Sequence, residues 1–463
     1  MKEKITSPIR GFHLVRYGTA ADQKYLLTPF AKTYDQLVIN ANMVAHMPGA
    51  LASFIMQRAK NKAYFIDPQT HAFQHDISHL ESTGEKTAGN IKKSIVSLIA
   101  AYGEPVQSVI SKKQRSILPS DFRNRSTFEG YCQRVIEFQK GRISHEAKQS
   151  EVAKYYKYLE KKGRISKANF GPTLVVAPYF YMTSNTYNEW INLNLRAIEF
   201  SKRVATDTPV AAQIVISKDL LTNTALSAAL VKRYSALKPS VFLIWIDTFS
   251  EQRVYDHELS MFTKLIKRLG EHAPVVNLYG GFFSIALKRC NITNALIGVC
   301  HGLEYGEHRG VVPVGGGVPI AKFYHPVMHK RLKFREAYRA IKKENGMRSS
   351  SDFHKLICDC AGCKSLIQND PEEDFAVYGR SRPVSFIRKN QPISMEYPLP
   401  ETKDHCVRHY MWCKQKEYGT SVSKASIMRD LDRSEKLKGT LGLEDIAYVS
   451  IWKKLLSVQA PRI

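Results

Sequence analysis

Three cysteines stand close together in this chain of 463 residues, in the segment Cys358-Asp359-Cys360-Ala361-Gly362-Cys363. Thiolates at the spacing C-x-C-x-x-C, on a turn eased by Gly362, are typical of a tetrahedral zinc site that takes one further ligand. Four protein ligands leave no open position for water, so the predicted zinc is structural. An iron–sulfur cluster and three unliganded thiols are the alternatives.

The fourth ligand is expected from a later helix. His405 begins an expected helix over 405–416 and is the predicted ligand. Cys406, His409 and Cys413 are neighbours on the same segment that could take its place. The sequence therefore predicts a metal centre made from Cys358, Cys360, Cys363 and His405.

Two aspartates follow apolar runs and could carry acid–base or nucleophilic chemistry. Asp67 comes after residues 63–66, and Asp247 comes after residues 241–246. Barrel enzymes keep their catalytic groups at the carboxyl ends of the strands, so both aspartates are predicted to be catalytic. A role as a helix N-cap is the alternative for each. His301 and Glu304, at the end of a later run, are reserve candidates.

The elements that would position these residues are short apolar runs, rich in β-branched and aromatic side chains, that predict buried parallel strands. Segments of helical periodicity lie between most of them. Eight strand–helix units favour a (β/α)8 barrel of the TIM type, and an open doubly wound sheet is the alternative. The runs cover residues 37–40, 63–67, 174–182, 211–217, 241–247, 275–280, 295–301 and 320–325.

The spacing of the runs predicts three parts. Residues 1–68 and 172–345 are expected to form the barrel. The interval 69–171 is too long for one crossover, so it is predicted as a basic, largely helical insertion with helices over 90–102 and 128–143. Residues 346–463 are predicted as a zinc-binding and C-terminal helical subdomain.

The charge is strongly basic, with 68 Lys and Arg against 42 Asp and Glu and a formal net charge of +26. Such an excess favours nucleic acid as a partner, and a basic surface that only aids solubility is the alternative. No run of about eighteen apolar residues predicts a membrane helix, and no secretory signal opens the chain, so we expect a cytoplasmic protein without a membrane partner. The predicted nucleic-acid-binding residues are Lys112, Lys113, Lys333 and a helical stripe of Arg331, Arg335 and Arg339.

Barrel strands, then C-x-C-x-x-C, then a helix that opens with His: this order resembles the tRNA-guanine transglycosylase superfamily. The segment His405-Cys406-Val407-Arg408-His409-Tyr410 is similar to the family's zinc-ligand helix. Residues 65–70 with Phe73-Gln74 resemble its Asp-containing loop. Residues 212–215 resemble its strand with a base-reading Gln, and residues 278–283 its Gly-Gly turn against the heterocycle. The resemblance covers about residues 35 to 415.

The resemblance implies replacement of guanine by a 7-deazaguanine through a covalent Asp-ribosyl intermediate, with a second carboxylate moving protons. It implies that Asp67 and Asp247 are these carboxylates. The base would be read and cradled by Gln213, Gly280 and Gly281, and Tyr181 or Phe282 would stack on it.

The long basic interval and the divergent strands look most like the DpdA-type branch, which puts a base of the 7-cyano-7-deazaguanine type into DNA. DNA is therefore favoured over tRNA, and partner proteins of a DNA-modification system are expected. A tRNA enzyme, a non-catalytic nucleic-acid-binding relative that serves a partner enzyme, and hydrolysis without exchange are the alternatives.

One segment departs from the family pattern. In the tRNA enzymes the nucleophilic Asp stands shortly before the zinc knot, in an Asp-Cys pair. The corresponding region here, Lys322-Phe323-Tyr324-His325-Pro326, has no Asp. The nucleophile has moved to Asp247, or the segment between is expanded, or the chain is not catalytic. Glycine-rich loops at 302–306 and 314–317 could hold phosphate or base.

Overall fold

Eight parallel strands form one sheet in the order β3-β2-β1-β8-β7-β6-β5-β4 in the computed structural model of the chain. Because β8 pairs with β1, the sheet curls into a barrel that is open only between β3 and β4. At that gap the Thr173 amide donates to the Tyr64 carbonyl at 2.9 Å. This nearly closed TIM-like barrel confirms the predicted α/β class and excludes the open doubly wound sheet. The structure describes residues 8–27, 29–58, 62–82, 88–149, 154, 157–158, 160–163, 170–303, 306–312, 321–388 and 391–457.

Seven of the eight predicted runs form barrel strands, and the eighth is wrong. Residues 320–325 were expected to close the barrel, but Lys322–His325 forms β9, which pairs antiparallel with β10 (Lys330–Lys333) in a separate hairpin. The barrel instead begins with a strand of sequence HLVRY. The barrel strands are β1 (His13–Tyr17), β2 (Gln36–Asn40), β3 (Ala63–Asp67), β4 (Val175–Val176), β5 (Val210–Ile216), β6 (Val241–Ile246), β7 (Val275–Asn277) and β8 (Leu296–His301).

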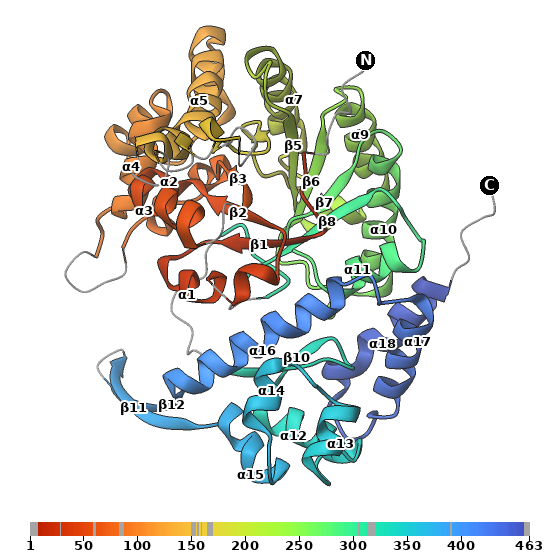
Figure 1. Cartoon of the computed structure of the whole chain (residues 1–463). Coiled ribbons are helices and arrows are strands. Elements are labelled where there is room, and N and C mark those ends of the chain that lie inside the picture. The colour runs from red at the N-terminus through yellow and green to blue at the C-terminus, as the bar shows by residue number, and fades with distance from the viewer. Residues whose placement is uncertain are drawn as a thin grey trace. The chain divides into compact units, whose positions relative to one another are not determined.

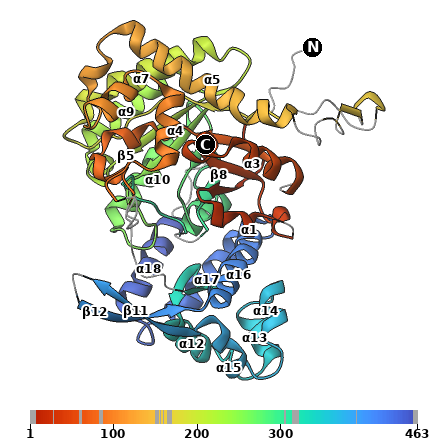
Figure 2. The same cartoon turned by 90° about the vertical axis from the view of Figure 1, so that its left-hand side faces the viewer.

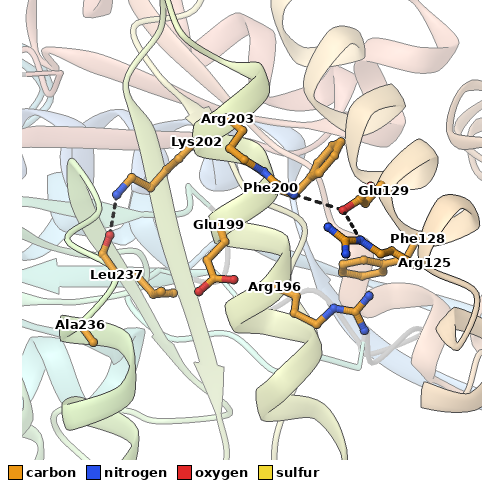
Figure 3. Close-up of a pocket in the computed structure, with 10 residues that line it drawn as sticks. All are labelled: Arg125, Phe128, Glu129, Arg196, Glu199, Phe200, Lys202, Arg203, Ala236 and Leu237. Carbon is orange, nitrogen blue, oxygen red and sulfur yellow. Dashed lines mark hydrogen bonds and ion pairs between the residues drawn. The ribbon is translucent and has the colours of Figure 1, made fainter.

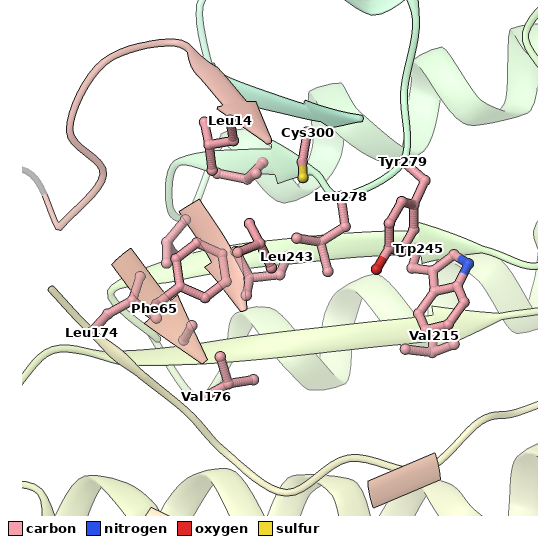
Figure 4. Close-up of a cluster of buried hydrophobic side chains, with 14 of the residues drawn as sticks. Leu14, Phe65, Leu174, Val176, Val215, Leu243, Trp245, Leu278, Tyr279 and Cys300 are labelled. Atoms are coloured by element: carbon pink, nitrogen blue, oxygen red, sulfur yellow. The ribbon is translucent and has the colours of Figure 1, made fainter. Parts of the chain in front are cut away.

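Alternate residues of the strands fill the barrel interior. Leu14, Val38 and Phe65 belong to this core, with Trp245 and Leu278 from the opposite wall (Figure 4). Successive side chains of a strand point to opposite faces, so residues two positions further along face the same way. Arg16, Asn40 and Asp67 follow Leu14, Val38 and Phe65 at this interval. The carboxyl ends of β1, β2 and β3 therefore turn polar side chains into the barrel.

Helices surround the sheet, and the described part of the interval between β3 and β4 includes α4 and α5. The long helix α5 contacts α3, which precedes β3, and α7, which follows β4 (Figure 1 and Figure 2). It therefore lies on the path of the crossover between β3 and β4. The expected helices over 90–102 and 128–143 correspond to α4 and α5. The bounds are α1 (Gln23–Leu26), α2 (Ala41–His46), α3 (Pro48–Ser53), α4 (Lys93–Tyr102), α5 (Arg125–Gln149), α7 (Tyr187–Val204), α8 (Lys218–Thr222), α9 (Thr224–Ser235) and α10 (Asp256–Gly270).

The contacts divide the chain into two compact units. The first consists of Met1–Ser250, His257–Gly281 and Thr293–Pro313, and it includes the interval 69–171 together with the barrel. The second consists of Glu251–Asp256, Phe282–Ile292 and Val314–Ile463. This division differs from the predicted barrel end at residue 345, because β9 packs against helix α16 of the second unit.

The second unit combines short antiparallel hairpins with helices. Within the described ranges, no helix is both long and apolar enough to cross a membrane. In addition to β9 and β10, the elements are α11 (Phe282–Arg289), α12 (Phe334–Lys343), α13 (Ser350–Leu356), α14 (Ala361–Leu366), α15 (Pro371–Asp374), β11 (Ser381–Arg388), β12 (Gln391–Pro398), α16 (Pro400–Tyr418), α17 (Lys424–Glu435) and α18 (Leu443–Ser457).

Candidate functional site

A buried cluster of three thiols and one imidazole lies in the second unit. The donor atoms of Cys358, Cys360, Cys363 and His409 all lie within 4.8 Å of one another. The three Sγ atoms are 3.9, 3.4 and 3.3 Å from His409 Nδ1. A tetrahedral zinc ion, with Zn–S of about 2.3 Å and Zn–N of about 2.0 Å, separates sulfur from nitrogen by about 3.5 Å. The donor set and its spacing therefore fit a metal ion such as zinc.

Neighbouring groups orient the imidazole as a ligand. His409 Nε2–H donates to the Tyr324 carbonyl at 2.7 Å, which leaves the Nδ1 lone pair directed at the sulfur atoms. The ring of Phe323 stacks on the imidazole at 4.2 Å. On the other side, Cys360 is the N-cap of α14, and its Sγ accepts from the Cys363 amide. The cluster is thus held by β9, α14 and α16 together.

The predicted fourth ligand, His405, is wrong, and His409 takes its place. Helix α16 begins at Pro400, so His405 lies in the second turn and is partly exposed. The buried stripe of the helix runs through Cys406, His409 and Cys413, at helical spacing. That stripe is visible in the sequence, and it would have identified the histidine one turn later. Cys413 Sγ lies 3.8 Å from Cys358 Sγ, beside the cluster.

In the first unit, two tyrosine hydroxyl groups each bond one of the predicted catalytic aspartates. Tyr179 OH donates to Asp67 Oδ1 at 2.5 Å, and Tyr181 OH donates to Asp247 Oδ2 at 3.2 Å. The two tyrosines stand two residues apart on the segment after β4, while Asp67 ends β3 and Asp247 follows β6. The structure therefore brings both aspartates to the carboxyl end of the barrel, joined by one short segment.

The environment of Asp67 favours its protonated form. The side chain is fully buried, and Oδ2 has no hydrogen-bond partner among the described residues. Burial raises the pKa of Asp67, and the opposing influences of Tyr179, Arg309 and Arg16 do not cancel this effect. His71 Nδ1 lies 3.0 Å from Tyr179 OH, the hydroxyl group that bonds Asp67. A carboxyl group in this state is suited to proton transfer.

The carboxylate of Asp247 accepts two hydrogen bonds from the described residues. Its Oδ1 accepts from the Val311 amide at 2.9 Å, and its Oδ2 accepts from Tyr181. Gln74 holds Tyr181 in turn, because its amide group bonds both the Tyr181 N–H and its carbonyl, at 2.6 and 3.1 Å. Asp247 is partly exposed. An oriented, accessible carboxylate of this kind is suited to nucleophilic attack.

Gln213 and Gly280 are both buried in the first unit, and they have different roles. Gln213 is buried on β5, and neither its Nε2 nor its Oε1 has a partner among the described residues. Such an unsatisfied amide is costly unless a ligand or water meets it. A Cβ on Gly280 would come within 2.3 Å of Asn277 Nδ2, so packing alone requires the glycine. Gly281 follows it, also buried.

The predicted stacking role of Phe282 is contradicted. Its ring lies parallel to the imidazole of His329, with centroids 3.3 Å apart, and Trp452 packs nearby. All three belong to the second unit. The residue is buried, so its face is occupied by the protein's own histidine and cannot stack on a base. Tyr181, the other residue predicted to stack, uses its hydroxyl group on Asp247.

The predicted stripe of three arginines is also wrong in part. Arg331 lies on β10, and its guanidinium sits 3.7 Å from the centroid of the Tyr410 ring. Helix α12 begins only at Phe334, and it exposes Arg335 and Arg339. Lys333, Lys112 and Lys113 are exposed as well. These five side chains are free to meet solvent or a polyanion.

Several residues at the barrel end were not predicted. They are Tyr179, His71, Arg16, Arg309, Trp245 and Tyr279. Arg16 was missed because β1 has no long apolar run. Among the reserve candidates, His301 places its Nε2 2.8 Å from that of His13. Glu304 and the loop 314–317 lie outside the described residues.

A hollow of about 800 Å³ lies on the outer helices of the first unit (Figure 3). Several of its charged groups have partners inside it: Glu129 pairs with Arg125 and Arg203, and Arg196 covers the ring of Phe128. The barrel end is therefore the better candidate for a reactive site than this hollow. It is lined by Arg125, Phe128, Glu129, Arg196, Glu199, Phe200, Lys202, Arg203, Ala236 and Leu237.

Comparison with known proteins adds no family. No protein-family model matches the sequence, and no curated protein matches it. The interpretation of the site therefore depends on its residues and their geometry.

Proposed function

We propose that the chain is a base-exchange transglycosylase, which replaces guanine in nucleic acid by a base of the 7-cyano-7-deazaguanine type, with DNA favoured over tRNA. One observation carries the proposal: Tyr179 and Tyr181 join two carboxyl groups, one buried and one accessible, at the carboxyl end of a TIM-like barrel. The Cys3His cluster further along the chain supports it. Two carboxyl groups at the catalytic end of the barrel and a zinc knot are what the resemblance to the tRNA-guanine transglycosylase superfamily implies.

The two carboxyl groups take different roles. Asp247 attacks the anomeric carbon of the target nucleotide and forms an ester to the sugar, while the bond to guanine breaks. Protonated Asp67 gives its proton to the departing guanine. The incoming 7-deazaguanine then loses a proton to Asp67 and attacks the same carbon, which releases Asp247. Gln213 offers an unsatisfied amide to the base edge.

The metal is zinc in this proposal, and its role is structural. Cys358, Cys360, Cys363 and His409 would hold it with all four positions filled, so it supplies folding energy to the second unit. The proposal takes no reaction step through the metal.

The reaction is tested by incubating the protein with labelled 7-cyano-7-deazaguanine and either duplex DNA or tRNA. We expect label in DNA, with one guanine released for each base inserted. Label in tRNA instead would assign the tRNA branch. Release of guanine without incorporation would indicate hydrolysis, and absence of both would contradict a catalytic role.

Binding should depend strongly on salt, because Lys and Arg displace the counterions of the phosphate backbone. The target base must also leave its stack, which requires a firm hold on the backbone. Reversing two exposed charges of α12, in the Arg335→Glu/Arg339→Glu variant, should weaken DNA binding. It should also make the fall of log K with log salt less steep, by about 2 in the slope. The slope is measured by fluorescence anisotropy.

Lys267→Glu, an equally exposed position on α10, is the matched control. If the α12 variant and this control gave the same affinity and the same slope, α12 would not be part of the nucleic-acid interface.

A further inference from the structure

Two arginine side chains lie at the carboxyl end of the barrel beside Asp67. Arg16 is on β1, and its Nε donates to Asn40 Oδ1 at 3.1 Å. Its guanidinium rests on the backbone of Gly18, where a Cβ would approach the central carbon to 2.4 Å. Only glycine leaves this space. The hydrogen bond to Asn40 and the close contact with Gly18 thus fix the position of the guanidinium group.

Arg309 follows β8 and is fixed equally well. Its NH1 group donates to Tyr279 OH at 3.0 Å, and its guanidinium lies 5.2 Å from the Trp245 ring centroid. The Arg309 carbonyl accepts from Trp245 Nε1 at 3.0 Å, which ties the segment to β6. A guanidinium held against aromatic rings loses little further freedom when it binds a ligand.

Within the described residues no carboxylate forms an ion pair with either guanidinium, although Asp67 acts on both charges and Asp22 on that of Arg16. Their hydrogen-bond partners, Asn40 and Tyr279, are neutral groups. Asp22 accepts from the amides of Gly18 and Thr19, at 2.9 Å each. Burial, and then the charge of Arg309, lower the pKa of Arg16, against the opposing effect of Asp22 and Asp67. Burial also lowers the pKa of Arg309, but Tyr279 and Asp67 outweigh it and the pKa is raised. Arginine keeps its proton in proteins, so two neighbouring guanidinium groups that bond only neutral groups indicate a place for an anion.

We propose that Arg16 and Arg309 bind a phosphate group of a nucleotide, as a monoester or a diester. Each planar guanidinium group can donate two parallel N–H hydrogen bonds to two oxygen atoms of a phosphate. Tyr279 and Arg309 follow β7 and β8, and TIM barrels frequently bind phosphate on the loops after these two strands.

The position beside Asp67 would set the phosphate next to the group that moves the proton. This inference deepens the proposed function and rests on it only for the source of the phosphate, since binding requires no base exchange.

Calorimetry on the full chain, at low ionic strength, tests the site. The probes are deoxyguanosine, deoxyguanosine 5′-monophosphate and the 5′-methyl diester of that nucleotide. The monophosphate should bind about tenfold or more tightly than the nucleoside, as charge-assisted hydrogen bonds predict. Arg16→Gln and Arg309→Gln should each bring this ratio close to 1. Tighter binding of the diester would assign the phosphate to a polymer, and tighter binding of the monoester to a free nucleotide.

Arg268→Gln, an exposed position on α10, is the control and should keep the ratio. Arg309→Lys keeps the charge without the fork and should give an intermediate ratio, which serves if Arg309→Gln fails to fold. Equal affinity for nucleoside and monophosphate in the unmodified chain would overturn the proposal. If the phosphate preference held while no base were exchanged, only the proposed function would fall.

Discussion

The His409→Ala variant should lose its metal and most of the stability of the second unit, while His405→Ala should keep both. His409 lies in the cluster, with Nδ1 within 3.9 Å of three sulfur atoms. His405 lies one turn earlier on the same helix and is partly exposed. Structural zinc contributes roughly 10–16 kcal/mol of apparent binding free energy to folding. Loss of one of four ligands should therefore cost more than about 4 kcal/mol, beyond the usual range for a single substitution.

Elemental analysis of the purified variants gives the metal content, and denaturant unfolding gives the stability. Cys360→Ser should behave as His409→Ala does. Cys406→Ser is its matched control, because Cys406 is an equally buried thiol on α16 that bonds the Tyr378 carbonyl. A metal-free His405→Ala variant together with a metal-loaded His409→Ala variant would show that the cluster is wrongly assigned. Zinc retained in all four variants would show that these side chains do not hold it.

Most of the barrel could be predicted because its strands are buried on both faces. Such strands are continuous apolar runs, and seven of them were found in this way. The first strand, HLVRY, was missed since it carries His13 and Arg16 among only three apolar residues. The run 320–325 predicts the eighth strand instead, because it contains four apolar residues in six. Its place in a separate hairpin depends on pairing with Lys330–Lys333, a contact that no local pattern encodes.

The candidate site, too, could be predicted from the sequence only in part. Asp67 and Asp247 could be found because each directly follows a strand. Tyr179 was not found, and Tyr181 was assigned to stacking on the base. The expected strand covered residues 174–182, whereas β4 is only two residues long and both tyrosines come after its end. The choice of His405 over His409 came from placing the start of α16 five residues too late. Arg331 was assigned to a helix that begins only at Phe334. Errors of a few residues at element ends thus changed the roles of individual side chains.

Asp247→Asn and Asp67→Asn should both strongly reduce the rate of base exchange, but only Asp67→Asn should stabilise the fold. Loss of a nucleophile removes the covalent route, so kcat should fall by about 10⁴ or more in Asp247→Asn. Loss of a general acid or base costs about 10²–10⁴, which is the range expected for Asp67→Asn. Single-turnover incorporation of labelled base measures both. Asp247→Asn should also fail to form the covalent adduct that a trapped reaction of the unmodified chain would show.

The stability effect follows from the raised pKa of Asp67, which burial causes. Between the ordinary carboxyl value of about 3.9 and the raised value in the folded chain, the folded state holds a proton that the unfolded state has lost. The stability of the unmodified chain therefore falls as pH rises through this window, and above the folded pKa the full penalty remains. An amide at this position does not ionise, so the Asp67→Asn variant escapes the penalty.

The melting temperature of Asp67→Asn should thus exceed that of the unmodified chain at neutral pH, and the difference should vanish as pH falls to about 4. Asp121→Asn supplies a control of opposite sign, because the hydrogen bond from Arg115 lowers the pKa of Asp121. That variant should be less stable at neutral pH. A residue that weakens the fold yet is needed for activity is typical of a catalytic group. If Asp67→Asn were destabilised at neutral pH and still exchanged bases, Asp67 would be a structural residue, and the assignment of the proton transfer to it would fail.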